Sequence, residues 1–205
     1  VNALINGIIE RAMKRYAVRL HAHCFMSNHY HLLQSSKDSA STSSFMQFVL
    51  SNIARETGRL RGWREKFWGR RYRASVVVDE AAQIERLKYI LTNSVKEGLV
   101  KHPRYWPGVH CYRHLAEGTK LNGIWIDRTL RYQSPDLDEE DVTSHSVLNL
   151  EPLPCLEHLP KHEYQQTIKT LTRDTLNECD LTRRFMGTKR ILAKHPLEAP
   201  DSVSR

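Results

Sequence analysis

The first part of the chain changes from a helical to a strand periodicity. In residues 3–15, apolar side chains recur every three or four positions with charged residues between them, which predicts an amphipathic helix. In residues 16–26 apolar residues alternate with arginine and histidine, as in a half-buried strand. A Ser-Asn turn follows, and "HYHLLQ" then predicts a second strand. Residues 16–34 are therefore expected to form a β-hairpin.

Helical periodicity returns in three later segments. A helix is expected over residues 44–58, after a polar loop with several candidate N-caps. A second should begin after Asp79 and end near Gly98, since aspartate caps helix starts and glycine caps helix ends. Residues 161–194 also show a helical pattern, with Gly187 as a break. Between the helix over residues 44–58 and the helix that begins after Asp79, "YRASVVV" predicts one further strand.

Together these elements predict an α+β fold, in which helices pack on an antiparallel sheet. We expect the main domain to cover residues 1–115. Residues 116–160 include the acidic run "SPDLDEEDVTS", which has little capacity to pack, and are expected to be a linker and irregular segment. Residues 161–205 should form a mostly helical C-terminal extension.

Net charge is divided unevenly between the two halves of the chain. Residues 1–115 hold 19 Lys and Arg against 8 Asp and Glu, whereas residues 116–205 hold 12 against 15. A basic half suggests a polyanionic partner, most simply nucleic acid, because neutralised phosphates supply most sequence-independent affinity. A solvated surface that keeps the chain soluble would give the same count.

Cysteine usage and hydropathy bear on the compartment. The four cysteines are far apart and form no C-x-x-C pair, which fits reduced thiols in a cytoplasm better than a disulfide framework. No window approaches the roughly eighteen apolar residues of a membrane span, and no secretory leader is evident near Val1. We therefore expect a cytoplasmic protein without a membrane partner, and a start at Val1 suggests a fragment.

Residues 55–73 combine cations with aromatic rings. Eight basic residues are interleaved with four aromatic ones, a composition typical of surfaces that bind unpaired nucleotides through phosphate contacts and base stacking. Aromatic core anchors with solvated arginines beside them would give the same composition. The residues that we predict to contact DNA are Arg64, Lys66, Trp68, Arg70, Arg71 and Arg73.

Two histidines in the second strand are candidate metal ligands. Alternate residues of a strand face the same side, so His29 and His31 should project together. A third ligand could be the amide oxygen of Asn93, a hard donor that Mg²⁺ or Mn²⁺ accepts. Tyr89 lies four residues earlier on the same helical face.

Each of these signals is weak by itself. Paired histidines on strands are usually polar residues on an exposed sheet face, and Tyr89 could be an ordinary helix residue. Asn93 could likewise be a solvated helix residue. Asparagine is a poor helix former, however, so its position in the middle of a predicted helix suggests a role other than helix formation. A second pair, His21 and His23, is expected to neighbour the first on the hairpin and to line bound DNA.

The motifs taken together resemble a known family. "HAHCFMSNHYHLLQ", followed about sixty residues later by "LKYILTNSVKEGLV", resembles the single-tyrosine transposases of the HUH endonuclease class, in particular the REP-associated branch. The basic "FWGRRYR" resembles the segment before the family's tyrosine helix, and the resemblance covers residues 16 to about 115. The positions that match the family's two main motifs are Met26, Asn28, His29, His31, Tyr89, Ile90, Asn93, Val95, Gly98 and Leu99.

Three features depart from the family pattern. Ser27 and Ser94 stand where the family has proline, which changes backbone stiffness more than chemistry. The family's first strand, which normally precedes the first helix, has no counterpart here. A fragment would therefore lack one strand of the sheet, and a truncated gene could encode an inactive protein.

The resemblance implies both a fold and a mechanism. The fold would be the ferredoxin-like or RRM-like palm of HUH endonucleases, and His29, His31 and Asn93 would hold Mg²⁺ or Mn²⁺. Tyr89 would attack a phosphate of single-stranded DNA and form a 5′-phosphotyrosine, so that a later 3′-hydroxyl can reseal the strand. The general acid and base are open, with water or Lys88 as candidates.

The expected partner is single-stranded or hairpin DNA, and family members commonly form homodimers, some of which share the tyrosine helix. Two other functions fit the same motifs. One is a catalytically inactive hairpin-binding protein derived from a transposase. The other is a nickase of the relaxase or replication-initiator kind, which shares the histidine pair. The sequence does not reveal which DNA sequence is recognised.

Overall fold

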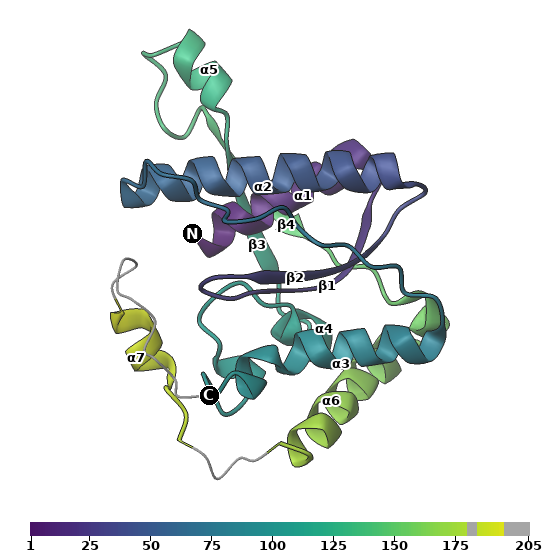
Figure 1. Ribbon diagram of the computed structural model, residues 1–205. Helices are drawn as coiled ribbons and strands as arrows, with labels where there is room; N and C mark the ends of the chain where they lie inside the picture. The colour runs from purple at the N-terminus through teal and green to yellow at the C-terminus, as the bar shows by residue number, and fades with distance from the viewer. Residues whose placement is uncertain (180–183, 195–205) are drawn as a thin grey trace.

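The computed structural model describes residues 1–179 and 184–194 and confirms a mixed α+β fold (Figure 1). No helix among these residues is long and apolar enough to cross a membrane. The elements in chain order are α1 Asn2–Tyr16, β1 Arg19–Phe25, β2 Tyr30–Ser35, α2 Ser39–Arg61, α3 Glu80–Lys96, the 3-10 turn η1 Pro103–Tyr105, α4 Tyr112–Glu117, β3 Leu121–Ile126, α5 Arg128–Gln133, β4 Thr143–Leu148, the 3-10 turn η2 Pro154–Leu156, α6 Lys161–Asn177 and α7 Thr188–Ala193.

The strands form two antiparallel pairs, β1 with β2 and β3 with β4, where the sequence predicted one sheet. The other edge of β1 is also covered, because the backbone N–H of Phe25 donates to Val109 and the N–H of Cys111 donates to His23. Near the start of β1, the backbone N–H of Glu151 donates to the Leu20 carbonyl. β1 is therefore an interior strand, with β2 on one side and two chain segments on the other.

Helices cover both faces of the β1–β2 hairpin. Figure 1 shows α1 and α2 on one side of the hairpin and α3, α4 and α6 on the other. A register shift between Leu20 and Ala22 divides the buried residues of β1 between these two layers. Leu20 and Phe25 pack in the core with α1 and α2, whereas Ala22 and Cys24 pack in the core with α3 and α6.

The β3–β4 hairpin lies against α1 at an unusually close approach. The Cα of Gly7 in α1 lies 2.9 Å from the point where a side chain on Gly123 would begin, and a Cβ on Gly7 would collide with the carbonyl of Ile124. Asn6 also donates a hydrogen bond of 3.0 Å to the Asn122 carbonyl. Only glycine at both positions lets the helix and strand backbones come this close.

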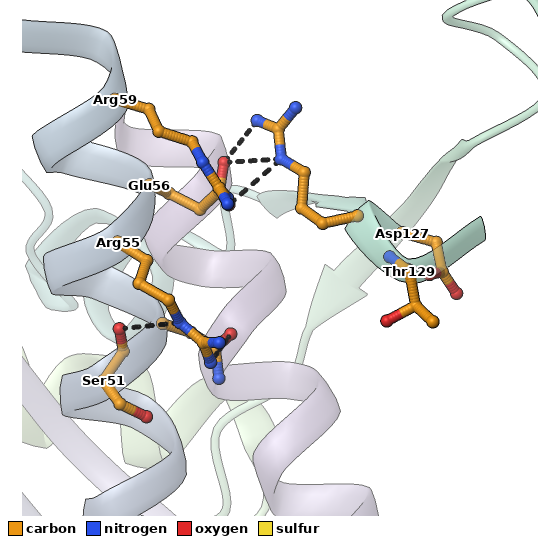
Figure 2. A network of polar contacts seen from close by, with 8 residues as sticks. Ser51, Arg55, Glu56, Arg59, Asp127 and Thr129 are labelled. Atoms are coloured by element: carbon orange, nitrogen blue, oxygen red, sulfur yellow. Dashed lines mark hydrogen bonds and ion pairs between the residues drawn. The ribbon is translucent and has the colours of Figure 1, made fainter. Parts of the chain in front are cut away.

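An ion-pair network joins α2 to the start of α5 (Figure 2). The buried Glu56 carboxylate accepts a hydrogen bond of 2.6 Å from Arg59 and others of 3.1 and 3.2 Å from Arg128 Nε. Burial raises the pKa of Glu56, but the hydrogen bonds and charge of Arg128, with those of Arg59, outweigh it and hold the pKa below its ordinary value. The network therefore ties the β3–β4 connection to α2.

The expected hairpin and the four expected helical regions are confirmed as far as they are described, with shifted ends. α2 begins earlier than predicted because Asp38 caps it by accepting a 2.7 Å bond from the Ser41 N–H. Asp79 caps α3 as expected, and Gly98 adopts a left-handed conformation just beyond its end. In the C-terminal extension α6 and α7 are present, whereas residues 180–183 and 195–205 lie outside the described residues.

Two sequence expectations are wrong. "YRASVVV" forms no strand, because none of residues 64–78 has a backbone hydrogen bond to another described residue, and Val76 and Val78 are 88% and 82% exposed. β-branched residues alone do not make a strand without a partner. The segment 116–160 is not irregular throughout, because its apolar flanks pair as β3 and β4 and leave the acidic run in the connection.

Gly7→Ala should destabilise the protein although alanine is the better helix former. The added methyl group meets the Ile124 carbonyl, so α1 must move away from β3. We expect the free energy of unfolding in urea to fall by about 1–3 kcal/mol. Gly69→Ala is the matched control, since a Cβ there meets nothing within 4 Å, and equal stability of the two variants would contradict the close approach.

Glu56→Gln should lower the free energy of unfolding at neutral pH by roughly 1–3 kcal/mol, because charged hydrogen bonds to Arg128 are lost. Since folding lowers the pKa of Glu56, its contribution is fully present above the ordinary glutamate range and is lost as the pH falls through the lower pKa of the folded state. The gap between variant and wild type should close on acidification. Glu85→Gln, in an exposed pair, should change little, and a pH-independent gap at Glu56 would refute this assignment.

Candidate functional site

The turn between β1 and β2 brings two histidines together. The turn is closed by a backbone bond of 2.8 Å from the Met26 N–H to the His29 carbonyl, and β2 begins at the next residue. The rings of His29 and His31 lie 5.0 Å apart between centroids. His29 Nδ1 donates to Asn28 Oδ1 at 2.7 Å, which leaves the lone pair on Nε2.

The helix α3 places a tyrosine against this pair. Its buried residues Leu87, Ile90 and Leu91 fix it on the hairpin core, so that Tyr89 lies at the rim of the same face. The rings of Tyr89 and His31 meet edge to face at 5.0 Å, and Tyr89 remains 37% exposed. A strand residue and a helix residue far apart in sequence thus share one small site that solvent can reach.

Asn93 lies one helical turn after Tyr89 and is 1% exposed. Neither its amide nitrogen nor its amide oxygen has a hydrogen-bond partner among the described residues, and the same is true of His31 Nε2. Buried polar atoms are nearly always paired, so unpaired ones are candidates for binding an ion or ligand. Asn93 does not face solvent, so it remains a candidate for the third metal ligand.

The two imidazoles and the Asn93 amide are candidate ligands for a divalent ion. Burial, with the neighbouring His29, lowers the pKa of His31 below its ordinary value, so the ring is neutral at pH 7 and has a lone pair to donate. The described residues contain no group of three or more His, Cys, Asp or Glu side chains that could hold a metal. An ion here would therefore need the amide oxygen of Asn93 as well as the two imidazoles.

Two lysines flank Tyr89 on α3. Lys96 follows it by two turns and carries its ammonium 5.8 Å from the centroid of the Tyr89 ring, within the range of a cation–π contact. Sequence reasoning did not single out Lys96, although its spacing of seven residues from Tyr89 indicated a shared face. Lys88, the candidate acid or base, is paired with Glu85 at 2.8 Å.

The predicted DNA-contacting residues lie in the connection between α2 and α3, which Figure 1 shows running from one helix to the other. Trp68 is half-buried, donates from Nε1 to the Leu50 carbonyl at 2.9 Å and packs against the Tyr30 ring. It anchors the connection on the hairpin. The basic side chains around it, Arg64, Lys66, Arg70, Arg71 and Arg73, are all exposed.

The second histidine pair does not line a surface. His21 and His23 are 2% and 0% exposed, and the two ring nitrogens of His21 bond the Glu151 carbonyl and Ser35 Oγ. Burial, with nearby His110, lowers the pKa of His23 to about 3, so it stays neutral in the core. The expectation of DNA contact failed because β1 is covered on both faces, which a half-buried strand pattern does not predict.

Comparison with known proteins identifies the N-terminal region. Residues 1–93 match the family model described as "Transposase IS200 like", a span that includes His29, His31 and Tyr89 and ends at Asn93. No curated protein and no solved structure matches the chain. Residues 1–93 of this chain are therefore similar to the IS200-like transposases.

Proposed function

We propose that this protein is a transposase that cleaves and rejoins single-stranded DNA at hairpins through a 5′-phosphotyrosine on Tyr89. The similarity of residues 1–93 to IS200-like transposases supports cleavage and joining of DNA in general. The observation that carries the finer proposal is the contact between the Tyr89 and His31 rings, together with the buried, unpaired amide of Asn93 one helical turn after Tyr89. The contact brings a solvent-accessible hydroxyl nucleophile beside one of the candidate metal ligands.

His29, His31 and Asn93 would hold Mg²⁺ or Mn²⁺. Their fit rests on the closeness of the two rings and on the unpaired atoms of His31 and Asn93. When bound, the ion would act as a Lewis acid on the scissile phosphate. Such help is needed because a neutral phenol is a poor nucleophile toward a phosphodiester.

The reaction at Tyr89 is a transesterification in which the bonds balance. The phenolic oxygen forms a bond to phosphorus while the bond from phosphorus to the 3′-oxygen breaks, and the proton lost by the phenol is balanced by the one gained by the leaving 3′-hydroxyl. The phosphotyrosine keeps the energy of the phosphodiester, so a second 3′-hydroxyl can reverse the step without ATP.

The basic connection between α2 and α3 would guide the DNA strand to Tyr89. Trp68 fixes this connection on Tyr30 of β2, close in sequence to His29 and His31. The exposed arginines around Trp68 can then neutralise phosphates on a strand that approaches the site. Sequence-independent contacts of this kind orient the substrate without reading bases.

A single chain supplies the whole proposed site. Tyr89 meets His31 of its own chain, and α3 is fixed from behind because it packs against α6 and against η1. The proposal therefore assigns catalysis in cis. A homodimer would be compatible with this assignment but is not required to complete the site.

Tyr89→Phe should abolish covalent adduct formation, because the hydroxyl oxygen that attacks phosphorus is removed while the ring packing on His31 is kept. The assay incubates a labelled single-stranded hairpin with the protein and Mn²⁺ or Mg²⁺, then detects adducts that survive denaturation. Tyr132→Phe is the matched control, since Tyr132 is 86% exposed on α5, and it should form adduct normally. Wild-type protein that binds the hairpin without forming adduct would favour the inactive binding protein instead.

Asn93→Leu should separate activity from stability. Leucine removes a buried amide that has no hydrogen-bond partner, so the free energy of unfolding should stay equal or rise, by up to about 1–3 kcal/mol. Adduct formation should nevertheless fall strongly, because the third ligand is lost. Thermal denaturation and the adduct assay measure the two effects, and an active Asn93→Leu protein would exclude Asn93 as a ligand.

A further inference from the structure

A hollow at the C-terminal end of α2 is not used by the proposed cleavage site. Its volume is about 370 Å³, at the lower end of the range of small-ligand sites. Two glycines keep it open, because Gly58 and Gly62 contribute no side chains to its wall. The other principal lining residues are Arg55, Arg59, Trp63 and Arg64.

The backbone of Trp63 is fixed by the way α2 ends. Gly62 adopts a left-handed conformation with φ of 63°, and the Trp63 N–H then donates to the Gly58 carbonyl at 2.9 Å. This pair of features is the usual glycine-based helix termination. The chain is therefore held in place at Trp63, whose side chain lines the hollow and is 39% exposed.

The Trp63 ring has no aromatic or hydrogen-bonding partner among the described residues. The other three tryptophans are all engaged: the indole N–H groups of Trp68 and Trp106 donate to backbone carbonyls, and Trp125 stacks on Phe48. Trp63 is thus the exception within the described chain. An accessible indole without a partner is suited to stacking on a flat ligand.

The charge of the hollow defines which ligand fits. Its lining includes three arginines and no acidic residue. Arg55 is held by the Ser51 carbonyl and Asn52, and Arg59 by Glu56, while Arg64 makes no hydrogen bond or ion pair with a described residue. A flat ring and guanidinium groups that line one hollow are suited to a nucleobase with its phosphate.

We propose that this hollow binds one unpaired nucleotide of the DNA that flanks the cleavage site. The base stacks on Trp63, and the adjoining phosphate meets Arg59 and Arg64. The position supports this, because the hollow opens at the start of the basic connection that Trp68 fixes on β2. Figure 1 shows the C-terminal end of α2 and the β1–β2 turn on the same side of the molecule. This inference rests on the proposed function only for the identity of the DNA.

The test measures binding of a labelled single-stranded oligothymidylate by fluorescence anisotropy in the Tyr89→Phe background, where no covalent adduct can form. Trp63→Ala should weaken binding roughly 5- to 150-fold, the effect of losing one base stack. Trp63→Phe should recover part of the affinity because a smaller ring remains. Tyr132→Ala, which removes an exposed aromatic ring on α5, should bind as the parent does.

Two further readouts identify the stacking and the charge. An abasic oligomer should bind Trp63→Ala and its parent equally, since the stacked base is gone from the ligand. Arg64→Ala should reduce the slope of log affinity against log salt by about 0.7, as expected for one phosphate contact to a single strand. Unchanged affinity in Trp63→Ala, or an equal loss with the abasic oligomer, would overturn the proposal.

The outcome is separable from that of the cleavage proposal. Trp63-dependent binding without any adduct from protein with an intact Tyr89 would support the nucleotide site and refute catalysis by Tyr89. Adduct formation together with unchanged binding in Trp63→Ala would support catalysis by Tyr89 and refute the nucleotide site. Circular dichroism of each variant confirms that the fold is kept.

Discussion

The burial of β1 between two helical layers is the constraint on which the site depends. α1 and α2 cover one face of the β1–β2 hairpin, and α3, α4 and α6 cover the other, so the position of α3 is fixed by its packing on Ala22 and Cys24. His31 lies opposite Cys24 in the strand pairing and therefore faces the same helix. The meeting of Tyr89 with His31 follows from this packing.

The same packing places polar groups where they are costly. The buried amide of Asn93 has no hydrogen-bond partner among the described residues, and the buried Nε2 atom of His31 also has none. An apolar side chain would fill the position of Asn93 at lower free energy, since an unpaired buried polar group costs about 1–3 kcal/mol. A local loss of stability at a candidate site is the pattern expected when residues serve a ligand.

The sequence predicted the parts of the structure that depend on local chemistry. The caps at Asp79 and Gly98, the helical periods and the hairpin follow from residues close together in the chain. What depended on distant partners was not predictable: the "YRASVVV" segment found no strand to pair with, and His23 was covered by residues from beyond position 100. The i, i+4 spacing placed Tyr89 and Asn93 on one face, but their burial followed only from the packing of α3.

The proposed mechanism requires that one chain hold a metal ion beside Tyr89, between the β1–β2 hairpin and α3. Titration with Mn²⁺, followed by the electron paramagnetic resonance signal of the free ion, measures this binding. We expect one bound Mn²⁺ per chain, with binding lost in His31→Ala, weakened in Asn93→Leu and kept in Tyr89→Phe. If the wild type binds no Mn²⁺, or if neither ligand substitution changes binding, the proposed metal site is refuted.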